Sequence, residues 1–189
     1  MFCGTSVQAQ TSAKKAPDRI AYYGSVQTGL QAGSSDIDIS AQILNGIQYK
    51  SWVLGIGTGY DGYGLPGIPI TLYGQKSFTT LKHKPFVYAQ SGMAIALKVN
   101  EWNVKAFGKD VYEPGNGFTA EFGVGYQWKV GKKIQLLANT GFAYKHHEVL
   151  ERQVYYIWSS VYPPEGYPDK FNTIDYYYRR FVCRFGISF

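Results

Sequence analysis

The chain has little cysteine and methionine and no long hydrophobic run. Its 189 residues include 2 Cys and 2 Met. Gly, Gln, Asn or a charge interrupts every apolar run well before the roughly 20 residues that a membrane-spanning helix needs, so no transmembrane helix is predicted. We expect Cys3 to be lost with the amino-terminal segment. Cys183 would then be the only cysteine, and no disulfide within one chain is expected.

Glycine and aromatic residues are abundant instead, with 22 Gly, 17 Tyr, 11 Phe and 4 Trp. This balance favours strands and tight turns over helices. Apolar residues recur at every second position, which is the side-chain period of a strand with two different faces. The segments with this period are 22–32, 37–49, 51–60, 68–78, 86–97, 118–130, 134–145 and 175–189. The sequence therefore predicts eight strands.

The last segment has the most regular pattern. One face carries Phe181, Cys183, Phe185, Ile187 and Phe189. The other face carries Arg180, Arg184, Gly186 and Ser188. A continuous apolar stripe opposite a polar one is typical of a strand in a transmembrane β-barrel. The pattern resembles the closing strand of Gram-negative outer-membrane barrels, and the resemblance implies that Phe185, Ile187 and Phe189 form the signal read by the barrel-assembly machinery.

The connections sort into short and long ones on opposite sides. Short turns are predicted near Lys50, at 80–84 and at 130–133. Longer loops are predicted at 33–36, 61–67, 98–117 and 146–174. All 13 Asp and Glu except Asp18 and Glu121 lie in or next to these loops, whereas lysines cluster at the turns. Short periplasmic turns and longer outer loops are the pattern of outer-membrane barrels.

Aromatic residues map to the two ends of the predicted strands. Those at the turn end are Tyr22, Tyr49, Trp52, Phe78, Phe86, Trp128 and Phe189. Those at the loop end are Tyr60, Tyr144, Tyr176, Tyr177 and Tyr178. Two aromatic girdles, one at each membrane interface, are expected from this distribution. A soluble lipocalin-like ligand-binding barrel, with apolar residues inside and polar ones outside, is an alternative because periodicity alone does not say which face is which.

Four segments carry a resemblance to a known family: 45–49 (NGIQY), 54–60 (LGIGTGY), 123–126 (GVGY) and the terminal Phe189. They resemble the outer membrane protein beta-barrel domain family, whose architecture is that of the OmpA membrane domain and OmpX. The resemblance covers about residues 20–189. It implies an all-β, eight-stranded antiparallel up-and-down transmembrane β-barrel with short periplasmic turns and long outer loops, located in the outer membrane of a Gram-negative bacterium.

The first residues do not belong to this pattern. Residues 1–10 end in a small-x-small cleavage site at 7–9 and are interpreted as the remnant of a secretion signal, with a start that is truncated or placed late. Residues 11–19 are expected to form a periplasmic amino-terminal tail. The transmembrane β-barrel is then expected to occupy residues 20–189.

The polar faces predict a packed lumen. Eight strands enclose a space that side chains fill, and the residues expected to fill it as a hydrogen-bonded network are Gln27, Gln42, Gln48, Gln90, Gln127, Glu121, Arg180 and Arg184. Glu121 is the only acid expected at membrane depth, and a buried carboxylate needs a partner. Arg184 or Arg180 should be that partner. The protein is therefore not expected to be a diffusive porin.

An enzymatic role rests on few residues. His146 and Glu148 could share a face of one strand, but His146 and His147 should point to opposite faces. A lipid A-modifying hydrolase is the alternative function, with His146 and Glu148 as weak catalytic candidates and Ser159 and Ser160 in the following loop. The His-x-Ser arrangement expected of the deacylase is not found. No cofactor or metal is predicted.

Recognition is the function that the long loops favour. Tyr155, Tyr156, Trp158 and Tyr162 are large amphipathic side chains that bind proteins or glycans well. The expected role is structural or in surface recognition, as an accessory subunit of an envelope complex. Expected partners are outer-membrane lipids, lipopolysaccharide, the barrel-assembly machinery and an envelope protein or glycan. The net charge of +6 is spread without a basic stripe, so nucleic-acid binding is not predicted.

Overall fold

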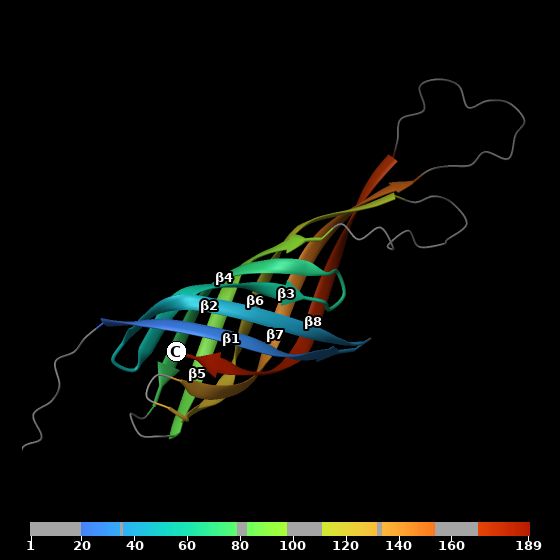
Figure 1. Cartoon of the computed structure of the whole chain (residues 1–189). Coiled ribbons are helices and arrows are strands. Elements are labelled where there is room, and N and C mark those ends of the chain that lie inside the picture. Colours follow the sequence, from blue (N-terminus) through green and yellow to red (C-terminus); the bar gives the residue numbers. More distant parts are fainter. Residues whose placement is uncertain (1–19, 35, 79–82, 98–110, 132–133, 154–169) are drawn as a thin grey trace, which may run out of the picture.

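A computed structural model describes residues 20–34, 36–78, 83–131 without 98–110, 134–153 and 170–189. They form eight strands (Figure 1): β1 (Ile20–Gly33), β2 (Ile37–Tyr49), β3 (Trp52–Asp61), β4 (Gly67–Ser77), β5 (His83–Ala96), β6 (Val111–Lys129), β7 (Gln135–Gln153) and β8 (Lys170–Ser188). The predicted segments 1–10 and 11–19 lie outside the described residues.

Each strand pairs antiparallel with the next one along the chain, and β1 pairs with β8 to close the sheet. The predicted eight-stranded up-and-down barrel is therefore confirmed. The predicted bounds of β2 are the observed ones, and those of β1, β3, β4 and β5 differ by up to three residues. Among the described residues, no helix is long and apolar enough to cross a membrane.

The outside of the barrel is apolar. Large hydrophobic side chains at alternate strand positions are exposed, such as Leu72, Phe122, Phe181 and Phe185. The positions between them are buried and mostly polar, as with Gln27 and Gln90. This distribution is the reverse of that in a soluble barrel and matches a barrel surrounded by lipid. The lipocalin-like alternative does not fit this surface.

One end of the barrel holds the short connections and is called the turn end; the opposite end is called the loop end. Lys50 and Ser51 form the two-residue turn between β2 and β3. The β4–β5 and β6–β7 connections lie at the same end, as predicted. Exposed aromatics surround this end: Tyr22, Tyr49, Trp52, Phe78, Trp128 and Phe189.

Strands β6, β7 and β8 are longer than predicted. Each has 19 residues and so spans about 60 Å, which is well beyond the reach of the other five. The three strands continue past the barrel as a ribbon (Figure 1). The loops predicted at 98–117 and 146–174 are therefore partly wrong, because 111–117, 146–153 and 170–174 are strand. Beyond the exposed apolar surface of the barrel, called the apolar band, the strands no longer carry an apolar residue at every second position. The sequence therefore gave no strand signal for these extensions.

A cluster of buried aromatic and aliphatic side chains lies in the turn-end half of the interior. The buried cluster consists of Tyr23, Leu44, Val53, Tyr73, Phe86 and Tyr88. Phe86 was predicted to belong to the girdle, and this is wrong because its ring is buried inside the barrel. Gly125 makes room for that ring, since a Cβ atom there would overlap it. Tyr178 is also not in a girdle, because its ring contacts the buried Tyr63.

We expect the folded barrel to be heat-modifiable and to resist extraction by carbonate. A closed sheet pairs its backbone groups within the barrel and leaves no edge in lipid, so it should stay folded in detergent until it is boiled. Unboiled and boiled samples should migrate differently in detergent gels. Complete release from membranes by carbonate would contradict a membrane-spanning barrel.

Candidate functional site

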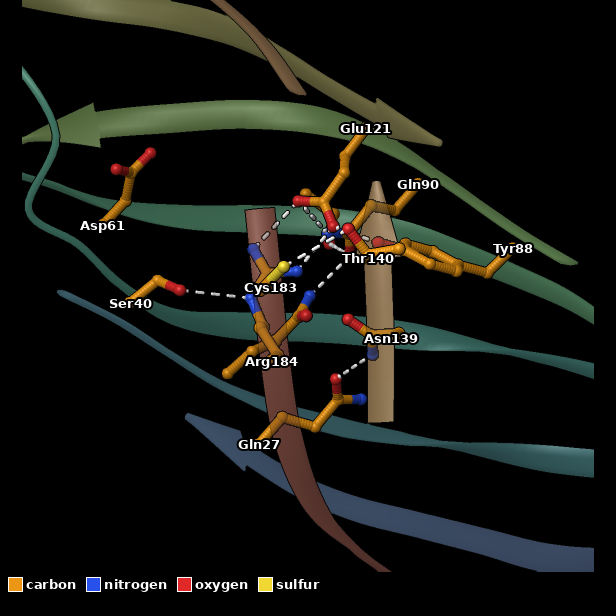
Figure 2. Close-up of polar contacts among 12 residues, drawn as sticks. Gln27, Ser40, Asp61, Tyr88, Gln90, Glu121, Asn139, Thr140, Cys183 and Arg184 are labelled. Carbon is orange, nitrogen blue, oxygen red and sulfur yellow. Dashed lines mark hydrogen bonds and ion pairs between the residues drawn. The ribbon is translucent and has the colours of Figure 1, made fainter. Parts of the chain in front are cut away.

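A bidentate ion pair occupies the middle of the lumen (Figure 2). Arg184 on β8 donates from Nη1 to Glu121 Oε1 at 2.5 Å and from Nη2 to Oε2 at 2.9 Å. Both residues are 5% exposed. The planar guanidinium matches the two carboxylate oxygens, and this geometry is the strongest form of charge-assisted hydrogen bond. Arg184 is therefore the partner that the buried Glu121 requires.

Neighbouring side chains complete the hydrogen bonding of this pair. Tyr88 donates its hydroxyl to Glu121 Oε1 at 2.8 Å, and Gln90 donates from Nε2 to Oε2 at 3.1 Å. Gln90 Oε1 accepts from Gln42 at 2.5 Å. Arg184 Nε also donates to Ser40 Oγ at 3.2 Å. The charges are thus satisfied from strands on both sides of the lumen, so the centre of the barrel is a filled polar layer.

A second charged cluster closes the loop end of the lumen. Asp61, at the end of β3, forms ion pairs with Arg180 of β8 and with Lys145 of β7 at 3.3 Å from Nζ. Lys145 is 0% exposed. Its ammonium also donates to the carbonyl oxygens of Tyr63 at 3.3 Å and Leu65 at 2.5 Å. Lys145 therefore links the Asp61 carboxylate to two backbone carbonyls of the β3–β4 connection.

The β3–β4 connection consequently folds into the barrel, and residues 62–66 are called the plug. Tyr63 and Leu65 of the plug are buried. The Arg180 guanidinium lies 5.7 Å from the centre of the Tyr63 ring, within the range of a cation–π contact. The Tyr63 hydroxyl lies against Gly33, where a Cβ atom would overlap it. The 61–67 connection therefore lies at the loop end, as predicted. Its buried side chains Asp61, Tyr63 and Leu65 point into the lumen, which was not expected.

The predicted lumen residues Arg180 and Gln127 are buried in the barrel, and Gln48 lies at its turn end. Arg180 does line the lumen, but its carboxylate partner is Asp61. Gln127 is buried and donates to Tyr23 at 3.4 Å. Gln48 lies at the turn end and donates to the Lys50 carbonyl. Asp61 was missed because a single Asp before a glycine-rich stretch is typical of a loop.

The two histidines of β7 point to opposite faces, as their spacing predicted. His146 faces outward, and its Nε2 lies 3.1 Å from Asp175 Oδ1, 29 residues away in the sequence. Its ring stacks on Tyr177 at 4.7 Å. One ligand atom each from His146, Glu148 and Asp175 lies within 4.8 Å of the others, so these three side chains could hold a divalent metal ion. Both carboxylates are exposed, and exposed carboxylates commonly occur without a metal, so no ion is assigned.

The hydrolase alternative would use His146 as a base. Asp175 supplies the group that orients such a base. A hydrolase also needs a nucleophile, and the candidates Ser159 and Ser160 lie outside the described residues. The catalytic role of His146 and Glu148 therefore stays a prediction.

His147 faces inward, beyond the apolar band. It is fully buried, and its Nδ1 lies 3.0 Å from the Gly115 carbonyl oxygen. Burial lowers the pKa of the His147 imidazole, so the ring is neutral at pH 7. A neutral ring that donates from Nδ1 to this carbonyl is consistent with a role in packing β7 against β6.

The closing strand presents its apolar stripe to the outside. Phe185, Ile187 and Phe189 are exposed. The backbone of Phe189 pairs with Gly24 in both directions at 2.9 Å, so the last residue completes the seam with β1. Recognition of these residues by the assembly machinery stays a prediction. The recognition candidates Tyr155, Tyr156, Trp158 and Tyr162 lie outside the described residues.

No protein-family model matches the sequence, and no curated protein sequence matches it either. Among solved structures, the chain is similar to Neisserial surface protein A (NspA), with a TM-score of 0.51 at 12% identity over 90% of this chain and 98% of that one. A major outer membrane protein from Thermus thermophilus gives a TM-score of 0.43 at 14% identity, covering 89% and 99% of the two chains. At this identity the likeness to NspA shows the barrel fold alone.

We expect Glu121 to be coupled energetically to Arg184 and not to Arg180. Replacing Glu121 or Arg184 by Gln should each cost on the order of 3 kcal/mol, because either change strands the other charge in the lumen. The double variant Glu121→Gln/Arg184→Gln should lose much less than the sum. The matched control is Glu121→Gln/Arg180→Gln, whose losses should add because Arg180 pairs with Asp61. Urea unfolding in detergent measures the two double variants and the three single variants, with Arg180→Gln as the third. Additive losses for Glu121 and Arg184 would refute the coupling.

Proposed function

We propose that this chain is an integral outer-membrane barrel of a Gram-negative bacterium that serves a structural or surface-recognition role. The exposed apolar band, the aromatic turn end and the exposed apolar stripe of the closing strand support the location. The fold shared with NspA agrees with it. With the turn end in the periplasm, the β6–β8 ribbon lies outside the cell.

The lumen does not offer a path for diffusing solutes. The plug with Asp61, Lys145 and Arg180 fills the loop end. The Glu121–Arg184 pair occupies the middle, and the aromatic cluster lies in the turn-end half beside buried polar side chains such as Gln75 and Gln127. A barrel of eight strands has an interior that side chains can fill, with room for one small ligand at most. The interior therefore supports a stabilising role for the barrel, and the function must reside on its outer parts.

The single observation that carries the recognition role is the ribbon. Above Gly33 and Arg180, β8 has no described strand beside it other than β7, because its pairing with β1 ends at that point. Above Gly117, β6 has β7 as its one partner among the described strands. Each of these edges therefore presents backbone donors and acceptors that an extended segment of a partner could pair with. An envelope protein is the partner class that this geometry favours, with the barrel as its accessory subunit.

Planar bilayer recordings should show no large, stable conductance steps for the purified protein. The plug, the Glu121–Arg184 pair and the turn-end aromatic cluster would all have to rearrange before ions could cross. A variant with Tyr63 and Leu65 changed to Ala should remain closed as well, because the Glu121–Arg184 layer is intact. Porin-like steps from the wild-type protein would contradict the sealed lumen.

Shortening the ribbon should abolish partner binding and leave the barrel intact. His147 and Tyr176 are register partners on β7 and β8, so residues 148–175 can be replaced by a two-residue Asn-Gly turn without changing the register. This removes most of the β8 edge and the β7 residues that pair with 111–114 of β6. Crosslinking in intact cells, followed by isolation in mild detergent, should give a defined envelope protein with the full chain and none with the short one. The short variant should still be heat-modifiable. Equal recovery of the same partner by both would place recognition elsewhere.

A further inference from the structure

The two free edges of the ribbon differ in their backbone. β6 carries Pro114, which has no N–H to donate, and its register with β7 shifts between Pro114 and Gly117. Prolines and bulges protect an edge strand from pairing with another chain. The register of β8 with β7 is continuous from Lys170 to Ser188, and β8 contains no proline. The β8 edge is therefore the one that lacks this protection.

The direction of the β8 backbone groups follows from the seam with β1. Phe189 both donates to and accepts from Gly24 of β1 at 2.9 Å, so its N–H and C=O point toward the β1 side. Residues at every second position of a strand point these groups to the same side. Along the continuous register, Thr173, Asp175 and Tyr177 share that direction. They lie above the end of the β1–β8 pairing, so their donors and acceptors face a side with no described strand.

The outward face beside this edge is acidic. Asp175 and Glu148 are register partners, and both are exposed. His146 contacts Asp175, but Glu148 has no ion pair with a described residue. Arg179, on the same face of β8, is four residues from Asp175, about 13 Å along the strand. Like charges directly opposite each other destabilise a sheet, so a positive group added at this edge would relieve the repulsion.

A second copy of the chain does not fit this edge. The ribbon continues the direction of the barrel strands (Figure 1), so two copies in one membrane would present β8 in the same direction. A two-fold axis that pairs two identical strand edges makes the strands antiparallel. The two barrels would then have to insert in opposite orientations. The edge therefore fits an extended segment of a different protein better than a second copy.

We propose that residues 173–179 of β8 are the docking strand for an extended segment of an envelope protein, which carries a lysine or arginine beside Asp175 and a β-branched or aromatic residue beside Tyr177. The inference rests on the recognition role proposed above and assigns it to one edge and one partner chemistry. Backbone pairing supplies affinity, and the side chains at alternate positions supply specificity. The basic residue faces the Asp175–Glu148 pair, and its neighbour packs on the exposed Tyr177 ring.

Hydrogen exchange of the purified full chain in detergent tests whether the edge is open. The amide hydrogens of Thr173, Asp175 and Tyr177 should exchange fast, because they have no ladder partner. Those of the residues between them point toward β7 and should exchange slowly. An alternation of fast and slow amides supports the free edge. Equal exchange of the two sets would overturn it, and protection of both would show that the chain covers its own edge.

Photo-crosslinking in intact cells tests the partner. A benzophenone amino acid at Thr173 should give an adduct with the same envelope protein that the shortened ribbon loses, and a lysine or arginine should lie two positions from the crosslinked residue. The matched position on the other edge is Tyr112 of β6, which should give no adduct. Adducts from Tyr112 alone, or a crosslinked segment without a basic residue, would overturn the β8 assignment and leave recognition by the ribbon intact. Capture of no partner by the full chain would overturn the recognition role itself.

A charge reversal tests the basic residue of the partner. Asp175→Lys should reduce the yield of the Thr173 adduct about fivefold, the upper range for an opposite-charge pair across two strands. Glu113→Lys is the matched control, because it makes the same charge change on β6; it should leave the yield unchanged. Both variants should remain heat-modifiable. Equal losses in the two variants would refute a basic residue beside Asp175.

Discussion

A carboxylate in the middle of a narrow barrel constrains the rest of this structure. Glu121 cannot be ionised there without a cation, and Arg184 is the cation that contacts it. Because strand side chains alternate, a slip of β8 by one residue would turn Arg184 toward lipid and bring Cys183 or Phe185 inside. The ion pair therefore contributes to fixing the register of the closing strand. It also determines the composition around it, since Tyr88, Gln90 and Ser40 supply the remaining hydrogen bonds.

The period of two in the sequence predicted the architecture, because contact with lipid requires an apolar residue at each outward position. Every outward position at membrane depth meets the same apolar solvent, so the stripe is regular and the strands could be counted. Where lipid ends, that constraint ends. On the ribbon, His146, Glu148 and Asp175 occupy outward positions, and for this reason the extensions of β7 and β8 were not recognised as strand.

The sequence predicted that polar and charged side chains line the lumen, but it did not predict which acid pairs with which arginine. That Glu121 needed an arginine followed from burial alone, but the choice between Arg184 and Arg180 depends on the tilt of the strands and on side-chain reach. No local signal indicated that Asp61 would compete for Arg180, because nothing nearby in the sequence distinguishes an aspartate that turns inward from one at a loop tip. Phe86 was misplaced for a similar reason, as only the cross-strand neighbour Gly125 reveals the space for its ring.

The plug has a consequence for how the chain can assemble. Asp61 belongs to the first third of the chain, whereas Arg180 is 119 residues later and Lys145 is on β7. A half-built sheet that ends at β4 would hold this carboxylate without either cation. The plug can therefore lock only after the last strands have arrived. The ion pairs of the plug therefore form only when the barrel has closed. This couples the β3–β4 connection to the last strands and makes the final step of folding cooperative.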